Sequence, residues 1–159
     1  MIFVTVGTTL PFDDLIRLIN GMVERGEIDE PVRCQIGPGH YEPKHCAWFR
    51  FKPELQAEIE NASLVIGHGG TGTVTGLLGA GKHFVAVANP AGADDHQRDF
   101  LHHLSQANPF LWTDRLDALP ALMEQARTFR SEAAPHQRLI DDLTPFLHHS
   151  FERRGRRVR

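Results

Sequence analysis

The chain has 159 residues, of which 41% are apolar and 23% charged, and its formal net charge is −3. This length and apolar content suffice for one domain with its own core, and two cysteines are too few for a disulfide framework. No apolar stretch is long enough to span a bilayer, and the N-terminal residues lack the basic region of a signal peptide, so we expect a cytoplasmic protein.

Charge is distributed unevenly along the chain. Residues 1–151 hold 12 Lys and Arg against 19 Asp and Glu, whereas residues 152–159 hold five Arg against one Glu. An acidic body argues against general nucleic-acid binding, which needs a positive face. We predict a single domain over residues 1–151 that includes a C-terminal helix. The basic tail, residues 152–159, is either solvated or in contact with anionic lipid or a partner.

Short apolar strands and amphipathic helices alternate along the whole chain. Strands are predicted at residues 1–6, 31–36, 47–51, 64–66, 83–88 and 110–112. Helices are predicted from Pro11 to Val23, from Pro53 to Asn61, at residues 73–80, between Asp95 and Asn108, after Asp117 and after Pro135. Strands without polar alternation, separated by helices, indicate a parallel sheet covered on both faces. The predicted fold class is therefore α/β, a doubly wound, Rossmann-like parallel sheet.

The stretch from Ser63 to Lys82, SLVIGHGGTGTVTGLLGAGK, joins a strand to a helix through a glycine-rich loop. Glycines let the backbone approach a ligand closely, and a helix N-terminus presents unpaired N–H groups to an anion. This pattern predicts a site for a phosphate or diphosphate. Gly72 and Gly76 each cost roughly 1 kcal/mol in a helix, and close approach by another element or a ligand is the expected reason.

Three other loops follow predicted strands, at Gly7–Thr9, Gly37 and Asn89–Asp95. The carboxyl ends of parallel strands share one edge of the sheet, and ligands bind there near a reversal of strand order. We therefore expect all four loops to converge on one crevice.

A dinucleotide site is one alternative, because Gly67-x-Gly69-x-x-Gly72 formally matches the Rossmann fingerprint. That fingerprint follows the first strand of its unit and is answered by an acidic residue about 20 positions on. The next strand here ends at Asn89 without a carboxylate, which disfavours an NAD(P)-binding protein. The spacing of Cys and His residues matches no common zinc module, so no metal is expected.

Several motifs occur in a fixed order: VTVGTT followed by Phe12-Asp13, QIG at Gln35–Gly37, LVIGHGGTGT, GKHFVAVAN and Asp95-His96-Gln97. Together they resemble the C-terminal domain of glycosyltransferase family 28 over roughly residues 1–113. The resemblance is greatest to short stand-alone versions, namely the soluble subunit of a two-part UDP-N-acetylglucosamine transferase and PssE-like subunits of exopolysaccharide synthesis. It implies the C-terminal half of a GT-B glycosyltransferase.

The function implied is that of a UDP-sugar-binding catalytic subunit of a two-component inverting glycosyltransferase, a hexosyltransferase. Its acceptor would be lipid-linked, in polysaccharide (exopolysaccharide or capsule) or glycolipid assembly. The resemblance implies that the donor is held without metal or cofactor, so that helix N-termini and polar donors stabilise the leaving diphosphate.

The resemblance also implies donor contacts from the residues that match the family's motifs. They are Gly7, Thr8, Phe51, Lys52, His68, Gly69, Gly70, Thr71, Gly72, Thr73, Asn89, Asp95, His96 and Gln97. The glycine loop is expected to hold the diphosphate, Asp95-His96-Gln97 to read the sugar, and main-chain groups near Phe51 and Lys52 to meet the uracil edge. His68 and Gln97 are the candidates for a catalytic role, His68 either as a base or as a residue that orients the loop or a phosphate.

Two departures qualify the implied mechanism. Related enzymes often carry a glutamate for the ribose where this chain has Gly76, which leaves a non-catalytic regulatory or scaffold subunit as an alternative. The acceptor-binding half is missing from 159 residues, so a membrane-anchored partner subunit is expected to supply it and to hold this chain at the cytoplasmic face of the membrane. An apolar seam for that partner could come from Leu139, Leu143, Phe146 and Leu147, or the same residues could pack on the chain's own sheet.

Overall fold

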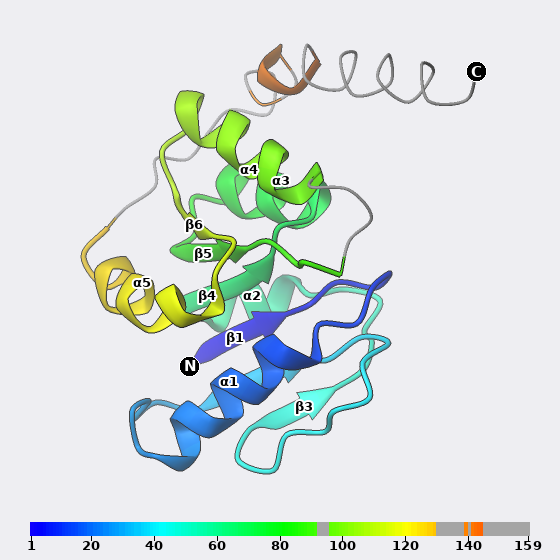
Figure 1. Cartoon of the computed structure of the whole chain (residues 1–159), viewed down its shortest axis with the longest axis vertical. Coiled ribbons are helices and arrows are strands. Elements are labelled where there is room, and N and C mark those ends of the chain that lie inside the picture. The colour runs from blue at the N-terminus through cyan, green and yellow to red at the C-terminus, as the bar shows by residue number, and fades with distance from the viewer. Residues whose placement is uncertain (92–95, 130–138, 140, 145–159) are drawn as a thin grey trace.

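The computed structural model describes residues 1–91, 96–129, 139 and 141–144. The strands in this part of the chain are β1 (Ile2–Thr5), β2 (Val32–Gln35), β3 (Ala47–Phe49), β4 (Leu64–His68), β5 (Phe84–Val87) and β6 (Leu111–Thr113). The helices are α1 (Asp13–Glu24), α2 (Gln56–Asn61), α3 (Thr71–Gly79), α4 (His96–Ala107) and α5 (Leu119–Ala126), with a 3-10 turn at Leu116–Ala118. All strand pairs are parallel, which confirms the predicted doubly wound α/β fold (Figure 1).

The strands lie in the order β3-β2-β1-β4-β5-β6. The chain builds the sheet outward from β1 to β3 and then returns to place β4 on the other side of β1. Thr5 at the end of β1 pairs with Gln35 on one side and with Gly67 on the other. The order therefore reverses between β1 and β4, and ligands of open α/β sheets bind beyond the carboxyl ends of the strands at such a point.

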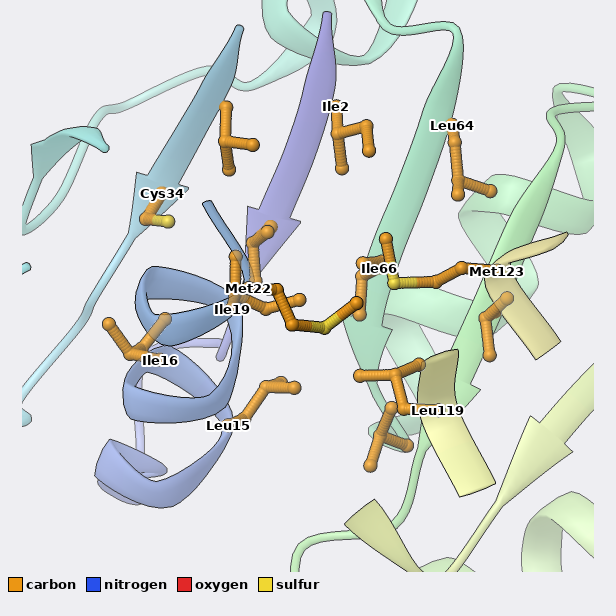
Figure 2. Packing of buried hydrophobic residues seen from close by; sticks show 14 of the residues in the cluster. Ile2, Leu15, Ile16, Ile19, Met22, Cys34, Leu64, Ile66, Leu119 and Met123 are labelled. Carbon is orange, nitrogen blue, oxygen red and sulfur yellow. The ribbon is translucent and has the colours of Figure 1, made fainter. Parts of the chain in front are cut away.

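Helices cover both faces of the sheet, because alternate strand residues point to opposite sides and both sides are apolar. Ile2 and Val4 lie on the face covered by α1 and α5, while Phe3 lies on the face covered by α2, α3 and α4. Figure 2 shows how the apolar residues of α1 and α5 pack on the first face. Those that it labels there are Leu15, Ile16, Ile19 and Met22 of α1, Leu119 and Met123 of α5, and the sheet residues Ile2, Cys34, Leu64 and Ile66.

Some predicted helix boundaries are wrong by two or three residues. α1 begins at Asp13, because the non-helical backbone of Phe12, with φ −139° and ψ 55°, separates it from Pro11. α2 begins at Gln56 rather than at Pro53. α3 begins at Thr71 directly after the extended Gly70, so Thr71 and Gly72 lie in its first turn rather than in the loop. Pro135 lies outside the described residues.

Helix α1 shapes the long connection between β2 and β3. The carboxylate of Asp13 accepts hydrogen bonds from the main-chain N–H groups of His40 (3.0 Å) and Tyr41 (3.2 Å). Buried Asn20 accepts N–H groups of Lys44 and His45, each at 2.8 Å. The loop after β2 is therefore fixed by side chains of the neighbouring helix. No helix in the described part of the chain is long and apolar enough to cross a membrane.

Candidate functional site

The loops after β1 and β2 meet backbone to backbone. Gly7 and Gly37 both have positive φ, at +79° and +53°, which favours glycine at each position. A Cβ atom on Gly37 would lie 2.5 Å from the carbonyl oxygen of Gly7, so no other residue fits this contact. Below them the buried Thr5 hydroxyl donates to the Gln35 side-chain oxygen. These contacts fix one wall of the expected crevice.

His68, the last residue of β4, fills a slot between the loops after β1 and β4. A Cβ atom on Gly7 would lie 2.5 Å from the imidazole, and one on Gly70 would come closer still. The Thr73 hydroxyl is 3.5 Å from Nδ1 of the ring. We call this arrangement of Gly7, Gly70 and Thr73 around the ring the His68 slot. Gly7 and Gly70, two of the predicted site residues, therefore leave room for the His68 ring.

The environment of His68 favours its neutral form. Burial lowers the pKa of His68 below its usual range, and a hydrogen bond with the main chain of Thr5 only partly opposes this shift. A neutral imidazole can accept a proton in principle, but this ring is enclosed by backbone on two sides. Of the two roles predicted for His68, this geometry favours a residue that holds two loops together over a catalytic base.

The N-terminus of α3 lies where the sequence predicts an anion-binding helix start, directly after the glycine loop. Gly70 is its N-cap residue and has no side chain with which to cap the first turn. The first N–H groups of a helix have no partner within the helix, so those of Thr71, Gly72 and Thr73 are available to a ligand. Thr71 and Gly72 are exposed, and Thr73 is half-buried. This end of α3 lies at the reversal of strand order, beside Gly7 and exposed Thr8.

Asn89 and Gln97 connect the β5 side of the crevice to the other loops. The side-chain oxygen of Gln97 accepts the Asn89 main-chain N–H at 2.8 Å and lies against Gly69. Asn89 donates through its side chain to the Pro11 carbonyl (2.9 Å) and accepts the N–H of Ala91 (3.0 Å). Asn89 is only 6% exposed, so the structure makes it a brace between loops rather than an open donor contact. The amide nitrogen of Gln97 is the group of this pair that can still donate to a ligand.

The remaining predicted donor contacts differ in their exposure and in their partners. His96, the first residue of α4, is half-buried, whereas Asp95 lies outside the described residues. Phe51 is 53% exposed beyond the end of β3. The ammonium group of Lys52 pairs with Glu58 on α2, so its side chain is engaged there and only its main chain is left for a base contact.

The expected reason for two glycines in α3 is partly wrong. A Cβ atom on Gly72 or Gly76 would have no described atom within 4 Å, so no described element approaches either residue closely. A ligand at the helix N-terminus remains the prediction for Gly72. At exposed Gly76, open space surrounds the position where related enzymes often carry an acid.

Of the two alternatives for the apolar seam, the structure favours packing on the chain's own core for the two members that it describes. Leu139 and Leu143 are 3% and 9% exposed and pack in the same cluster as Phe100 and Leu104 of α4. Asn108 donates to the Asp142 carboxylate at 2.9 Å and supports this packing. The other two members, at positions 146 and 147, lie outside the described residues.

Sequence reasoning missed the polar side chains that hold the loops. Asp13 and Asn20 bind the loop after β2, and Glu58 pairs with Lys52 and Arg33, yet nothing in the spacing of these residues predicts these contacts. Motif order is the signal that found the glycine loop, and it carries no information about such supporting contacts.

Comparison with protein families matches this chain to a known group. The model described as "Glycosyltransferase family 28 C-terminal domain" matches residues 1–132. The UDP-N-acetylglucosamine transferase subunit ALG13 of Yarrowia lipolytica is 29% identical over 168 residues, covering 92% of this chain and 86% of the relative. ALG13 of Homo sapiens is 32% identical over 142 residues, covering 82% of this chain but only 12% of that much longer relative.

Solved structures agree on the fold. An NMR structure of ALG13 superposes with a TM-score of 0.58 at 18% identity, covering 89% of this chain and 93% of the other. MurG of Acinetobacter baumannii superposes with a TM-score of 0.53 at 20% identity, covering 77% of this chain and 40% of the other. This chain therefore corresponds in fold to less than half of that larger protein.

Proposed function

The chain belongs to the glycosyltransferase family 28 C-terminal domain family, and its fold is that of one half of a GT-B glycosyltransferase. On this premise we propose that it is the donor-binding subunit of a two-component inverting glycosyltransferase whose donor is a UDP-sugar. Relatives named as UDP-N-acetylglucosamine transferase subunits make UDP-N-acetylglucosamine the first donor to test.

One observation carries the proposal. An uncapped helix N-terminus lies at the reversal of strand order, with the His68 slot directly beside it. A helix N-terminus favours a phosphate through both its free N–H groups and its dipole. The position is the one at which an open parallel sheet binds its ligand.

The residues around this point have distinct roles in the proposed reaction. The N–H groups at the start of α3 receive the diphosphate and stabilise the charge that develops on it as the sugar leaves. Neutral His68 holds the loop after β1 against the loop after β4, so that these donors are in place before the donor binds. The amide nitrogen of Gln97 donates to a sugar hydroxyl, while its oxygen keeps Asn89 in position.

The general base and the acceptor site are proposed to come from the partner, because this chain corresponds to one half of a GT-B enzyme. We propose a membrane-anchored partner subunit that holds this chain at the cytoplasmic face of the membrane. The acceptor is proposed to be lipid-linked, in exopolysaccharide, capsule or glycolipid assembly.

The test is a titration of the purified chain with UDP, UDP-N-acetylglucosamine, UDP-glucose, UDP-glucuronate, ADP and NADH, followed by amide NMR shifts. We expect UDP and one UDP-sugar to shift Thr71, Gly72 and Thr73, and ADP to bind more weakly than UDP. The matched control is Gly79 at the opposite end of α3, whose amide should not shift.

The possible results separate the candidates. Binding of NADH in place of UDP would overturn the proposal in favour of a dinucleotide protein. UDP binding without transferase activity in the assembled complex would instead favour the regulatory subunit. If the complex turns over and loses this activity when the loop before α3 is altered, the result supports the role of donor-binding subunit.

A further inference from the structure

Glu58 is a buried carboxylate in a helix of six residues. It lies on α2 and is 5% exposed, although α2 is otherwise short and mostly exposed. Burying a carboxylate is costly unless it is paired and hydrogen-bonded. Lys52 donates to it, and Arg33 lies 3.9 Å from the same oxygen. The hydrogen bond from Lys52 lowers the pKa of Glu58, so the carboxylate is charged at neutral pH.

Both cations also lie over one aromatic ring. The guanidinium of Arg33 is 5.4 Å, and the ammonium of Lys52 is 4.9 Å, from the centre of the Phe49 ring at the end of β3. Cations attract the face of an aromatic ring, and more strongly where water is excluded. Arg33, Phe49, Lys52 and Glu58 therefore form one connected group, which we call the Glu58 cluster. It ties the segment after β3 to α2.

The same segment is held from its other side by Arg50. Its guanidinium donates to the Gly39 carbonyl at 2.6 Å and to the Glu42 carboxylate at 2.8 Å. Its own carbonyl accepts the Gly37 N–H at 3.2 Å. Residues 50 and 52 are thus anchored to two different segments, and exposed Phe51 lies between them in the chain. A segment held at both ends with its centre exposed is preorganised for contact with a ligand.

We infer that Glu58 is a positioning residue for the donor's base. It holds Lys52, and thereby the main chain of Phe51 and Lys52, where this segment can meet the uracil edge. The inference rests on the proposed function, because it assumes a uridine donor in the crevice. Main-chain recognition requires close placement of donors and acceptors, so a segment released from α2 reads the base less well. The diphosphate is held at α3 and does not depend on this cluster.

The experiment compares affinities for UDP, ADP and inorganic pyrophosphate, measured by calorimetry on the full chain. Glu58→Gln is expected to weaken UDP binding about tenfold, the effect of roughly one hydrogen bond, and to leave pyrophosphate binding within about twofold. Preference for UDP over ADP should fall by a similar factor. Glu58→Asp, which keeps the charge, should recover part of the loss.

Further variants distinguish positioning from general damage to the fold. Lys52→Met should reproduce the effect of Glu58→Gln, and the double variant should be no worse than either, because both remove the same pair. Glu60→Gln is the matched control, since Glu60 is an exposed residue of the same helix whose carboxylate accepts a hydrogen bond from Gln56. Its affinities should equal those of the wild type. Melting temperatures identify any variant that is not folded during the titration.

Each result has a definite meaning. Equal weakening of UDP and pyrophosphate in Glu58→Gln would overturn the inference, because it would show a general loss of structure. Unchanged UDP affinity in Glu58→Gln and Lys52→Met would overturn it while leaving the proposed function intact. Failure of the wild-type chain to bind UDP would overturn the proposed function and this inference with it.

Discussion

Replacing Gly70 with Ala tests whether the His68 ring fills the slot between two loops. Gly70 has φ −74° and ψ 139°, which alanine adopts freely, so the backbone adds no strain. The new Cβ atom would lie 2.9 Å from Cδ2 and 3.0 Å from Cε1 of the ring, and closer still to Nε2. Overpacking of this kind costs about 1–3 kcal/mol, and each kcal/mol lowers the melting temperature of a chain of this size by roughly 2–4 °C.

The assay is urea unfolding of four proteins: the wild type, Gly70→Ala, His68→Ala and the double variant. Removing the ring removes the clash, so the two changes should be coupled by about 1–2 kcal/mol. Gly76→Ala is the matched control, because Gly76 is exposed within the same helix and its Cβ would have no described atom within 4 Å. That control should stabilise the chain by about 0.5–1 kcal/mol, the gain of alanine over glycine in a helix.

Additive effects of Gly70→Ala and His68→Ala, within about 0.5 kcal/mol, would refute the slot. So would a Gly70→Ala variant as stable as Gly76→Ala. If the coupling is found, Gly70→Ala should also weaken UDP binding, because a displaced ring or a shifted α3 N-terminus moves the N–H groups that we propose receive the diphosphate.

Three further results are expected. Gln97→Glu keeps an acceptor for the Asn89 N–H but removes the amide donor and adds a negative charge. Turnover by the assembled complex should therefore fall at least about tenfold, while the melting temperature of the chain changes little. Stability should fall as pH drops below 6.5, the ordinary pKa of histidine, because burial lowers the pKa of His68 and the unfolded chain then binds more protons. That loss should be complete only once the pH has passed the lowered pKa, and urea unfolding at pH 7.5 and 5 should show it to be smaller in His68→Asn. Asp13→Ala should lower the free energy of unfolding by about 1–3 kcal/mol, because it leaves N–H groups of the loop after β2 without their acceptor. Asp14→Ala removes an exposed ion pair with Arg17 and should lower it by less than about 1 kcal/mol. Equal losses would contradict the role given to Asp13.

The sequence was sufficient to predict the parallel sheet and the edge at which its strand-end loops meet. Buried β-branched strands separated by amphipathic helices restrict the fold to a covered parallel sheet, and that topology brings the strand-end loops together. The glycine loop was also predictable, because a strand, glycines and a helix follow each other directly in the chain. The family suggested by motif order is confirmed by the match over residues 1–132. The donor contacts themselves stay predictions.

What could not be predicted depends on contacts between distant segments. Glu58 has the pattern of a surface residue, and only the meeting of α2 with β2 and the end of β3 buries it. Gly70 must be small because the His68 ring, two residues earlier in the chain, lies against it. Gly7 must be small because of the same ring, which belongs to another strand and is distant in the sequence. The choice between a partner seam and packing on the chain's own sheet stayed open for a related reason. Leu139 and Leu143 have the spacing of an apolar helix face, and spacing alone does not say whether that face covers its own sheet or another protein.

The loops at the carboxyl ends of the strands combine contacts that the chain makes with itself and groups that it leaves exposed, and the two have different consequences for binding. The loops are held together by the chain itself, through Asn89 and Pro11, Gln97 and Asn89, and Arg50 and Gly39. The N–H groups of α3 and the ring of Phe51 are left exposed at the same edge. Preorganised donors cost little to bring into place when a charged ligand arrives, so the chain should be able to bind its nucleotide before it meets a partner. The partner would then act on a donor whose diphosphate is already held, and its contribution should appear in turnover more than in nucleotide affinity.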